Sequence, residues 1–136
     1  MELTNINAIP FVYRVQATIT SINGTAQATL ILQQDSRFEL LAIYGTSAPN
    51  GSFTSEDTKT NPNGFSCSIR DQTTGRDLTS ARIQQRLLCG NAFNPFTQKR
   101  GIVFEPSTNL LFDFLDLSGV VNNAVELALV GYKYII

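Results

Sequence analysis

The chain has no histidine among its 136 residues, no tryptophan, two cysteines and one methionine. Without histidine there is no imidazole to act as a general base, to complete a Ser-His-Asp or Cys-His arrangement, or to ligate a transition metal. Gly-rich phosphate-binding motifs are missing from the sequence too. These absences predict a protein that is not an enzyme and that uses no cofactor and no metal.

Charge is scarce as well, since 15% of the residues are charged and the net charge is -1. Binding to nucleic acid needs a basic field that displaces counterions, so no nucleic-acid partner is expected. Polarity comes instead from Thr, Asn, Ser and Gln, which together make up 43 residues. Uncharged hydroxyl and amide groups suit antiparallel sheets, turns and hydrated contacts between proteins.

Targeting and membrane signals are also lacking. The first residues form neither a basic nor an apolar signal-peptide region, so no signal peptide is expected. The most apolar stretch, 119–136, contains two Asn, one Glu and one Lys, and no membrane span or membrane partner is expected. Cys67 and Cys89 form no CxxC motif. We expect buried free thiols, although a single disulfide between them stays open.

Hydrophobic residues recur with a period of two, which is typical of half-buried strands. Runs rich in β-branched and aromatic residues, bounded by turn residues, predict strands at 11–20, 26–32, 37–44, 65–70, 101–105, 110–117 and 124–136. Asn23-Gly24 predicts that the first two strands form a hairpin. The segment 79–88 fits a short helix and a strand equally well.

This pattern predicts one domain, 1–136, that is all-β: an antiparallel β-sandwich or jelly roll of about eight strands with at most one short helix. Two segments stand apart from it. Residues 1–10 form either a frayed tail or an extended arm that adds to a neighbour's sheet. Residues 45–64 form a long polar loop, which is either a surface loop or an arm that contacts a partner.

Acidic residues offer no catalytic pair. Asp113 and Asp116 lie three positions apart on a predicted strand, so their side chains point to opposite faces and cannot share a substrate. Together with Asn122 and Asn123 they form the best local set of oxygens for a calcium ion. The simpler interpretation, which we adopt, is that Asp116 and Ser118 cap a turn.

The last predicted strand is apolar on both faces. Val125, Leu127 and Leu129 lie on one face, and Ala124, Ala128, Val130 and Tyr132 on the other. A solitary sandwich is expected to have a polar outer face. A helix or loop of the same chain over the sheet is the alternative that stays open. We expect instead that the outer face is buried between subunits, with Ala128, Val130 and Tyr132 as the self-association residues.

The second half of the sequence resembles a known family. The motifs are Phe104-Glu105-Pro106, the run 110–116, Leu117-Ser118-Gly119 with Asn122, and Val125-x-Leu127-x-Leu129-x-Gly131-Tyr132-Lys133, together with the upstream Ile69-x-Asp71, Thr74-Gly75-Arg76 and Leu78. In these motifs residues 65–136 resemble the C-terminal half of small virion structural proteins of tailed bacteriophages. The resemblance implies a β-sandwich capsid cement or decoration protein that is oligomeric, with no catalytic residues. The loop 45–64 departs from the family pattern.

The function expected from residues and resemblance together is that of a non-enzymatic bacteriophage virion protein. It stabilises the head through a homo-oligomer, expected to be a trimer, and through contacts with the major capsid protein, and it is located in the virion after assembly in the host cytoplasm. Exposed aromatic and Arg side chains are common interface anchors, so the expected docking residues are Phe53, Phe93, Phe96 and Arg100.

Two alternatives remain. One is a neck or tail ring adaptor or head-fibre base protein with the same fold. The other is a carbohydrate- or ligand-binding β-sandwich module, against which the absence of tryptophan counts.

Overall fold

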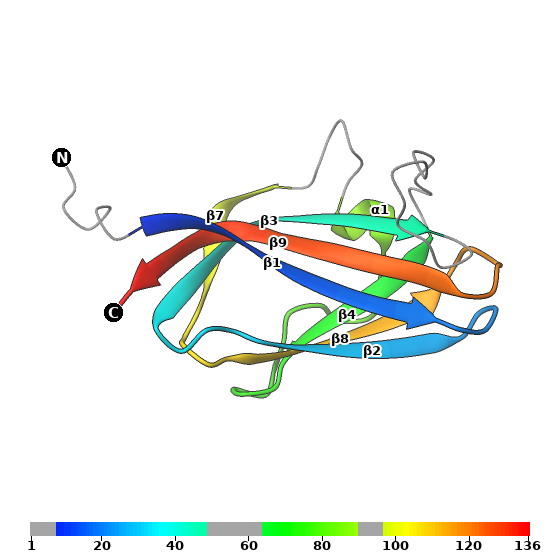
Figure 1. Ribbon diagram of the computed structural model, residues 1–136, viewed down its shortest axis with the longest axis horizontal. Helices are drawn as coiled ribbons and strands as arrows, with labels where there is room; N and C mark the ends of the chain where they lie inside the picture. The colour runs from blue at the N-terminus through cyan, green and yellow to red at the C-terminus, as the bar shows by residue number, and fades with distance from the viewer. Residues whose placement is uncertain (1–7, 49–63, 90–96) are drawn as a thin grey trace.

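Two antiparallel sheets pack face to face in the computed structural model, which describes residues 8–48, 64–89 and 97–136 (Figure 1). Their elements, in chain order, are β1 (Ala8–Ile19), β2 (Thr25–Ile31), β3 (Ser36–Ala48), β4 (Phe65–Asp71), β5 (Arg76–Asp77), β6 (Ile83–Gln84), α1 (Gln85–Leu88), β7 (Thr97–Phe104), β8 (Asn109–Asp116) and β9 (Asn123–Ile135).

The strand order is that of a jelly roll. One sheet has the order β1-β9-β3-β7, and the other has the order β2-β8-β4-β5, with β6 also pairing with β4. Because β5 and β6 pair with opposite ends of β4, they act as one interrupted strand. The result is an eight-stranded double sheet, so the predicted antiparallel β-sandwich or jelly roll with one short helix is confirmed.

The core lies between the sheets and is built from alternate residues of each strand. In β4 the side chains of Phe65, Cys67 and Ile69 are buried, as their alternation with polar residues predicts. Its largest fully buried side chains are five phenylalanines: Phe38, Phe65, Phe104, Phe112 and Phe114. Burial of each contributes roughly 2–3 kcal/mol before the entropy of ordering is subtracted.

The first turn forms as predicted, but the hairpin prediction is wrong. Asn23 has a positive φ of 56°, which an asparagine tolerates. β1 and β2 nevertheless belong to different sheets, so the turn connects the two layers. The reason is competition: β1 pairs along its whole length with β9, and β2 pairs with β8.

Several predicted boundaries also need correction. β1 begins at Ala8, so the last three residues of the predicted tail or arm 1–10 are paired with β9, and residues 1–7 lie outside the described residues. Residues 45–48 of the predicted loop 45–64 belong to β3, because they pair with β9, and residues 49–63 lie outside the described residues. β7 begins at Thr97, ahead of the predicted start at 101. The segment 79–88 is neither one helix nor one strand: β6 is followed directly by α1, which has only four residues.

Gly131 interrupts the alternation of β9 for a steric reason. The register between β3 and β9 shifts between Leu40 and Ala42, which marks a β-bulge. A Cβ atom at Gly131 would lie 1.8 Å from the backbone oxygen of Glu39, so only glycine fits beside the bulge.

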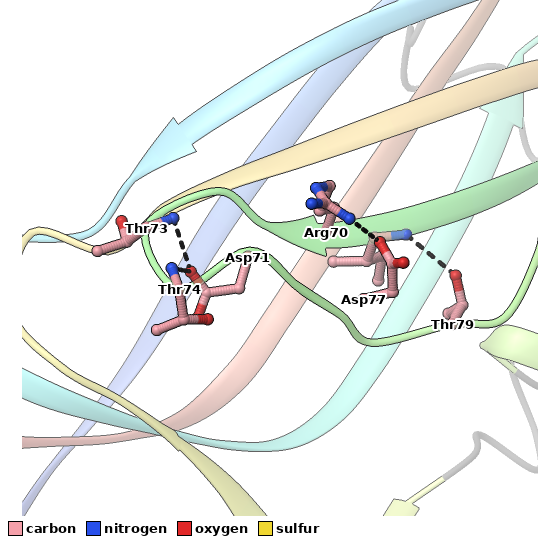
Figure 2. A network of polar contacts seen from close by, with 7 residues as sticks. Arg70, Asp71, Thr73, Thr74, Asp77 and Thr79 are labelled. Carbon is pink, nitrogen blue, oxygen red and sulfur yellow. Dashed lines mark hydrogen bonds and ion pairs between the residues drawn. The ribbon is translucent and has the colours of Figure 1, made fainter.

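A polar turn closes the far end of β4 (Figure 2). The buried carboxylate of Asp71 accepts hydrogen bonds from the backbone N–H groups of Thr73, at 3.0 Å, and Thr74, at 3.2 Å. Nearby, Arg70 pairs with Asp77 at 2.6 Å. This turn therefore satisfies its own polar groups, as the turn residues at 71–75 predict.

Candidate interaction surface

β9 presents two different faces, as its sequence predicts. Val125, Leu127 and Leu129 are fully buried in the core. Ala128 and Val130, on the outer face, are only partly covered. This is the face on which the self-association residues were predicted.

Apolar side chains continue from β9 across the neighbouring strands. In the register of the sheet Val12 lies opposite Val130, and Tyr44 lies opposite Ala128. Val103 lies opposite Glu39, which is itself opposite Tyr132. We call the resulting six-residue surface the apolar band: Val12, Tyr44, Val103, Ala128, Val130 and Tyr132. Its largest exposed side chains are Val12 (53%), Val103 (52%), Tyr44 (40%) and Tyr132 (39%).

Polar contacts flank the apolar band and reach into it at two places, because Arg14 lies opposite Ala128 and Glu39 lies between Tyr132 and Val103. Toward the β1–β2 turn, Arg14 pairs with Glu126 on the adjacent strand. Toward the other end, the hydroxyl of Tyr134 donates a hydrogen bond of 2.7 Å to Glu39, which, together with burial, raises the pKa of Tyr134. An apolar centre with a polar border is the arrangement found in protein–protein interfaces.

The outer face of the second sheet differs. It carries the ion pairs Arg70–Asp77 and Arg82–Asp113, the latter at 2.8 Å. Thr25, Gln27 and Thr29 of β2 are exposed on the same face. The two outer faces are therefore unequal, and the apolar one belongs to the sheet that contains β9.

A buried carboxylate holds together the turns at one end of the sandwich. Asp116 is fully buried and accepts hydrogen bonds from the backbone N–H of Asn23 (3.0 Å), from the N–H and hydroxyl of Ser118 (2.9 and 2.5 Å), from the N–H of Gly119 (3.3 Å) and from the side-chain amide of Asn123 (3.1 Å). Burial by itself raises the pKa of Asp116, but the bonds from Ser118, Asn23 and Asn123 outweigh it and hold the pKa below its ordinary value. The predicted turn cap is confirmed.

The Asp116 cluster, defined as Asp116, Ser118 and Asn123, also fixes the start of β4. The side chain of Asn123 and the backbone N–H of Leu117 both donate to the carbonyl of Gly64, at 2.9 and 3.0 Å. Gln85 of α1 accepts a bond from the N–H of Gly64 and donates one to the carbonyl of Gly45. Because its two oxygens accept five hydrogen bonds, Asp116 has a structural role: it holds these turns together.

The remaining reactive groups are also held inside the fold. Cys67 and Cys89 are free and buried; burial raises the pKa of both thiols, to about 12 for Cys89. Asp113 and Asp116 lie on opposite faces of β8, as predicted. Across residues 8–48, 64–89 and 97–136, no three His, Cys, Asp or Glu side chains are grouped so that they could hold a metal ion.

Most of the predicted docking residues lie outside the part of the chain that the structure describes. Phe53, Phe93 and Phe96 fall outside the described residues, and of Arg100 only the backbone in β7 is described. Sequence reasoning missed Val12, Tyr44 and Val103 as members of the apolar band. The alternation within their strands was visible, but which strands flank β9 was not.

Comparison with known proteins gives little further information. No family model matches the chain, and no curated protein does either. Among solved structures, the decameric BFDV capsid protein is matched over 93% of this chain and 98% of that chain, with 13% identity and a TM-score of 0.33. So loose a structural likeness bears on neither the fold, which rests on the strand order, nor the function.

Among the described helices none is both long and apolar enough to cross a membrane.

Proposed function

We propose that this chain is a non-enzymatic structural protein that acts by assembly, as a capsid cement or decoration protein of a tailed bacteriophage. The observation that carries the proposal is the apolar band on the outer face of the β1-β9-β3-β7 sheet. Three of its members, Ala128, Val130 and Tyr132, are the residues proposed for self-association. Burial of this face between copies would remove apolar surface from water and stabilise the assembly.

Two further considerations support a role in a virion. The jelly-roll strand order is a common architecture of viral capsid domains, although fold alone does not determine function. The resemblance of residues 65–136 to small phage virion proteins points in the same direction. In the proposed role a homotrimer binds the major capsid protein, and contacts across several capsid subunits stabilise the shell by mass action.

Native mass measured by light scattering across a dilution series tests the proposal. We expect a trimer for the unmodified chain and dissociation for Val130→Lys, because the substitution places a charge inside the apolar band. The matched control is Ser68→Lys in β4, an inner strand on the polar outer face of the other sheet, which should leave the mass unchanged. A monomer at every concentration, or equal behaviour of the two variants, would contradict the proposal.

The same experiment separates the neck or tail adaptor, which would form a ring of six or more copies. A carbohydrate-binding module is a second candidate, because jelly rolls also occur in lectins and because Tyr44 and Tyr132 are exposed on one face. Calorimetric titration with a glycan panel distinguishes it: saturable heat that Tyr132→Ala abolishes would replace the structural role with a binding one.

A further inference from the structure

One side of the sandwich is open in both layers. β1 is the last strand of its sheet and β2 is the last strand of the other. They are connected by the turn at 20–24 and run side by side, one in each layer (Figure 1). Within the part of the chain that the structure describes, no strand pairs with the outer edge of either.

The register shows which backbone groups of β1 face outward. The N–H of Ile136 donates to the carbonyl of Asp35, just beyond β3, so even-numbered residues of β9 direct their backbone groups to β3 and odd-numbered residues direct theirs to β1. Even-numbered residues of β1 therefore direct N–H and C=O groups away from the sheet. Pro10 is at one of these positions. A strand tolerates proline there, because the missing N–H would have faced away from the sheet. The others are Val12, Arg14, Gln16 and Thr18.

The same reasoning applies to β2. The N–H of Leu32 donates to Thr108 at 2.9 Å, and the N–H of Asp116 donates to Gly24 at 2.9 Å. Even-numbered residues thus face β8, and odd-numbered residues face outward. The outward residues are Thr25, Gln27, Thr29 and Ile31.

Neither edge has the features that usually prevent pairing with another strand. Proteins protect free edges with lysines, prolines, bulges or very short strands. β1 and β2 have 12 and 7 residues and an unbroken register with their inner neighbours. Arg14 is the one charged residue among the eight outward positions, and its guanidinium is paired with Glu126. Pro10 limits only one end of β1.

We propose that a second copy of this chain pairs with both edges, β1 antiparallel to β1 and β2 antiparallel to β2, about one two-fold axis. The four outward residues of β1 are symmetric about Val15, and those of β2 are symmetric about Ala28. These two centres lie at nearly equal chain distance from Ile22 in the connecting turn, so a single axis normal to both sheets passes close to both. One rotation then completes two ladders of hydrogen bonds.

The presence of two free edges, one in each layer, favours a second copy of the chain over an extended peptide as the partner. The layers of a sandwich lie about 10 Å apart, so one extended peptide reaches only one edge. The same side of another copy presents two strands with the matching separation and direction. This contact uses backbone groups at the edges of the sheets, whereas the apolar band uses side chains on a face, and Val12 is the one residue that belongs to both. A threefold contact through the band combined with a two-fold contact through the edges would link trimers to one another. Gln16→Pro would return such an assembly to the mass of the trimer, which distinguishes it from a closed ring of six or more copies.

Amide hydrogen exchange, followed residue by residue by NMR at low and high protein concentration, tests the proposal. Raising the concentration should slow exchange of the eight outward amides by at least about tenfold, because each gains a hydrogen-bonded partner. The inward amides of the same strands, such as those of Tyr13 and Val15, are bonded at every concentration and serve as the internal control. Fast exchange of the outward amides at high concentration would overturn the proposal.

Three variants separate the contact through the strand edges from the contact through the apolar band. Gln16→Pro removes one outward N–H without removing a bond to β9, and should weaken dimerisation at least about tenfold. Gln16→Thr keeps the N–H and should not. Val130→Lys should leave the concentration-dependent protection in place, so loss of the edge contact and loss of the band contact are separable. Protection confined to β1 would indicate addition of a single segment and would also overturn the proposal.

Discussion

Asp116 is a buried carboxylate whose hydrogen-bond donors carry no positive charge. Backbone N–H groups, a hydroxyl and a side-chain amide stabilise its ionised form. Each hydrogen bond to a charged group contributes about 1.5–3 kcal/mol when its partner is correctly placed. Because the donors come from the β1–β2 turn and the β8–β9 turn, a single side chain connects segments that are far apart in the sequence. The rigidity of this end of the sandwich depends on its ionised form.

We predict that Asp116→Asn destabilises the protein by about 2–3 kcal/mol at pH 7, because an amide replaces an acceptor with a donor that faces other donors. The folded pKa lies below the unfolded value of about 3.9, so the carboxylate contributes fully above that value, and its contribution is lost as the pH falls through the folded pKa. Urea unfolding at pH 7 and pH 3 should show the difference between variant and unmodified chain shrinking at the lower pH. Asp113→Asn is the control.

That control removes one partner of the surface pair with Arg82 and should cost no more than about 1 kcal/mol. If Asp116→Asn behaved like it, the Asp116 cluster would have no special role in stability. A difference that stayed constant between the two pH values would contradict the role of ionisation.

At the scale of elements, α1 shows how a short helix becomes fixed. Four residues are too few for a helix that is stable by itself. Its first residue, Gln85, is buried and bonds the N–H of Gly64 at 2.9 Å and the carbonyl of Gly45 at 3.0 Å. The helix is held by one side chain that satisfies backbone groups of two other segments.

Gln85→Ala should therefore leave the buried N–H of Gly64 and the partly buried carbonyl of Gly45 without this partner, and destabilise the fold by about 2–4 kcal/mol. Arg86→Ala, on an exposed position of the same helix, is the matched control and should change stability by less than about 0.5 kcal/mol. Chemical denaturation of both variants measures the difference. Similar stabilities for the two would show that α1 contributes through packing alone.

The elements also show what the sequence can and cannot predict. Alternation of apolar residues predicted the strands, the inward face of β4 and the two faces of β9, because the period of a strand is local. The Asn23-Gly24 turn was predicted too, but not its role, since pairing of β1 with β9 or with β2 is decided by residues a hundred positions away. Asp116 and Ser118 were predicted to cap a turn, whereas the bonds of Asn123 and Gln85 to Gly64 had no local signal.

At the scale of the molecule, the two thiols report on cooperative unfolding. Cys67 lies in β4 and Cys89 follows α1, and both are buried with raised pKa values. Neither should react with a thiol reagent in the native protein at pH 8, because access and the thiolate form are both suppressed. With increasing urea, both should react at the midpoint seen by circular dichroism. Reaction of one thiol well before that midpoint would show that its element opens separately.

The pairing of β1 with β9 has a consequence for fusion proteins. Ala8 lies opposite Tyr134, and Ile19 lies opposite Asn123, so β1 begins beside the end of β9 and ends beside its start. Cargo attached ahead of Ala8 or after Tyr134 would emerge from the same pole of the molecule. The opposite pole, where Ile22, Leu117 and Val121 are exposed on the turns, would carry no cargo. A single particle could thus be decorated at one pole through either end of the chain while the other pole stays available for contact.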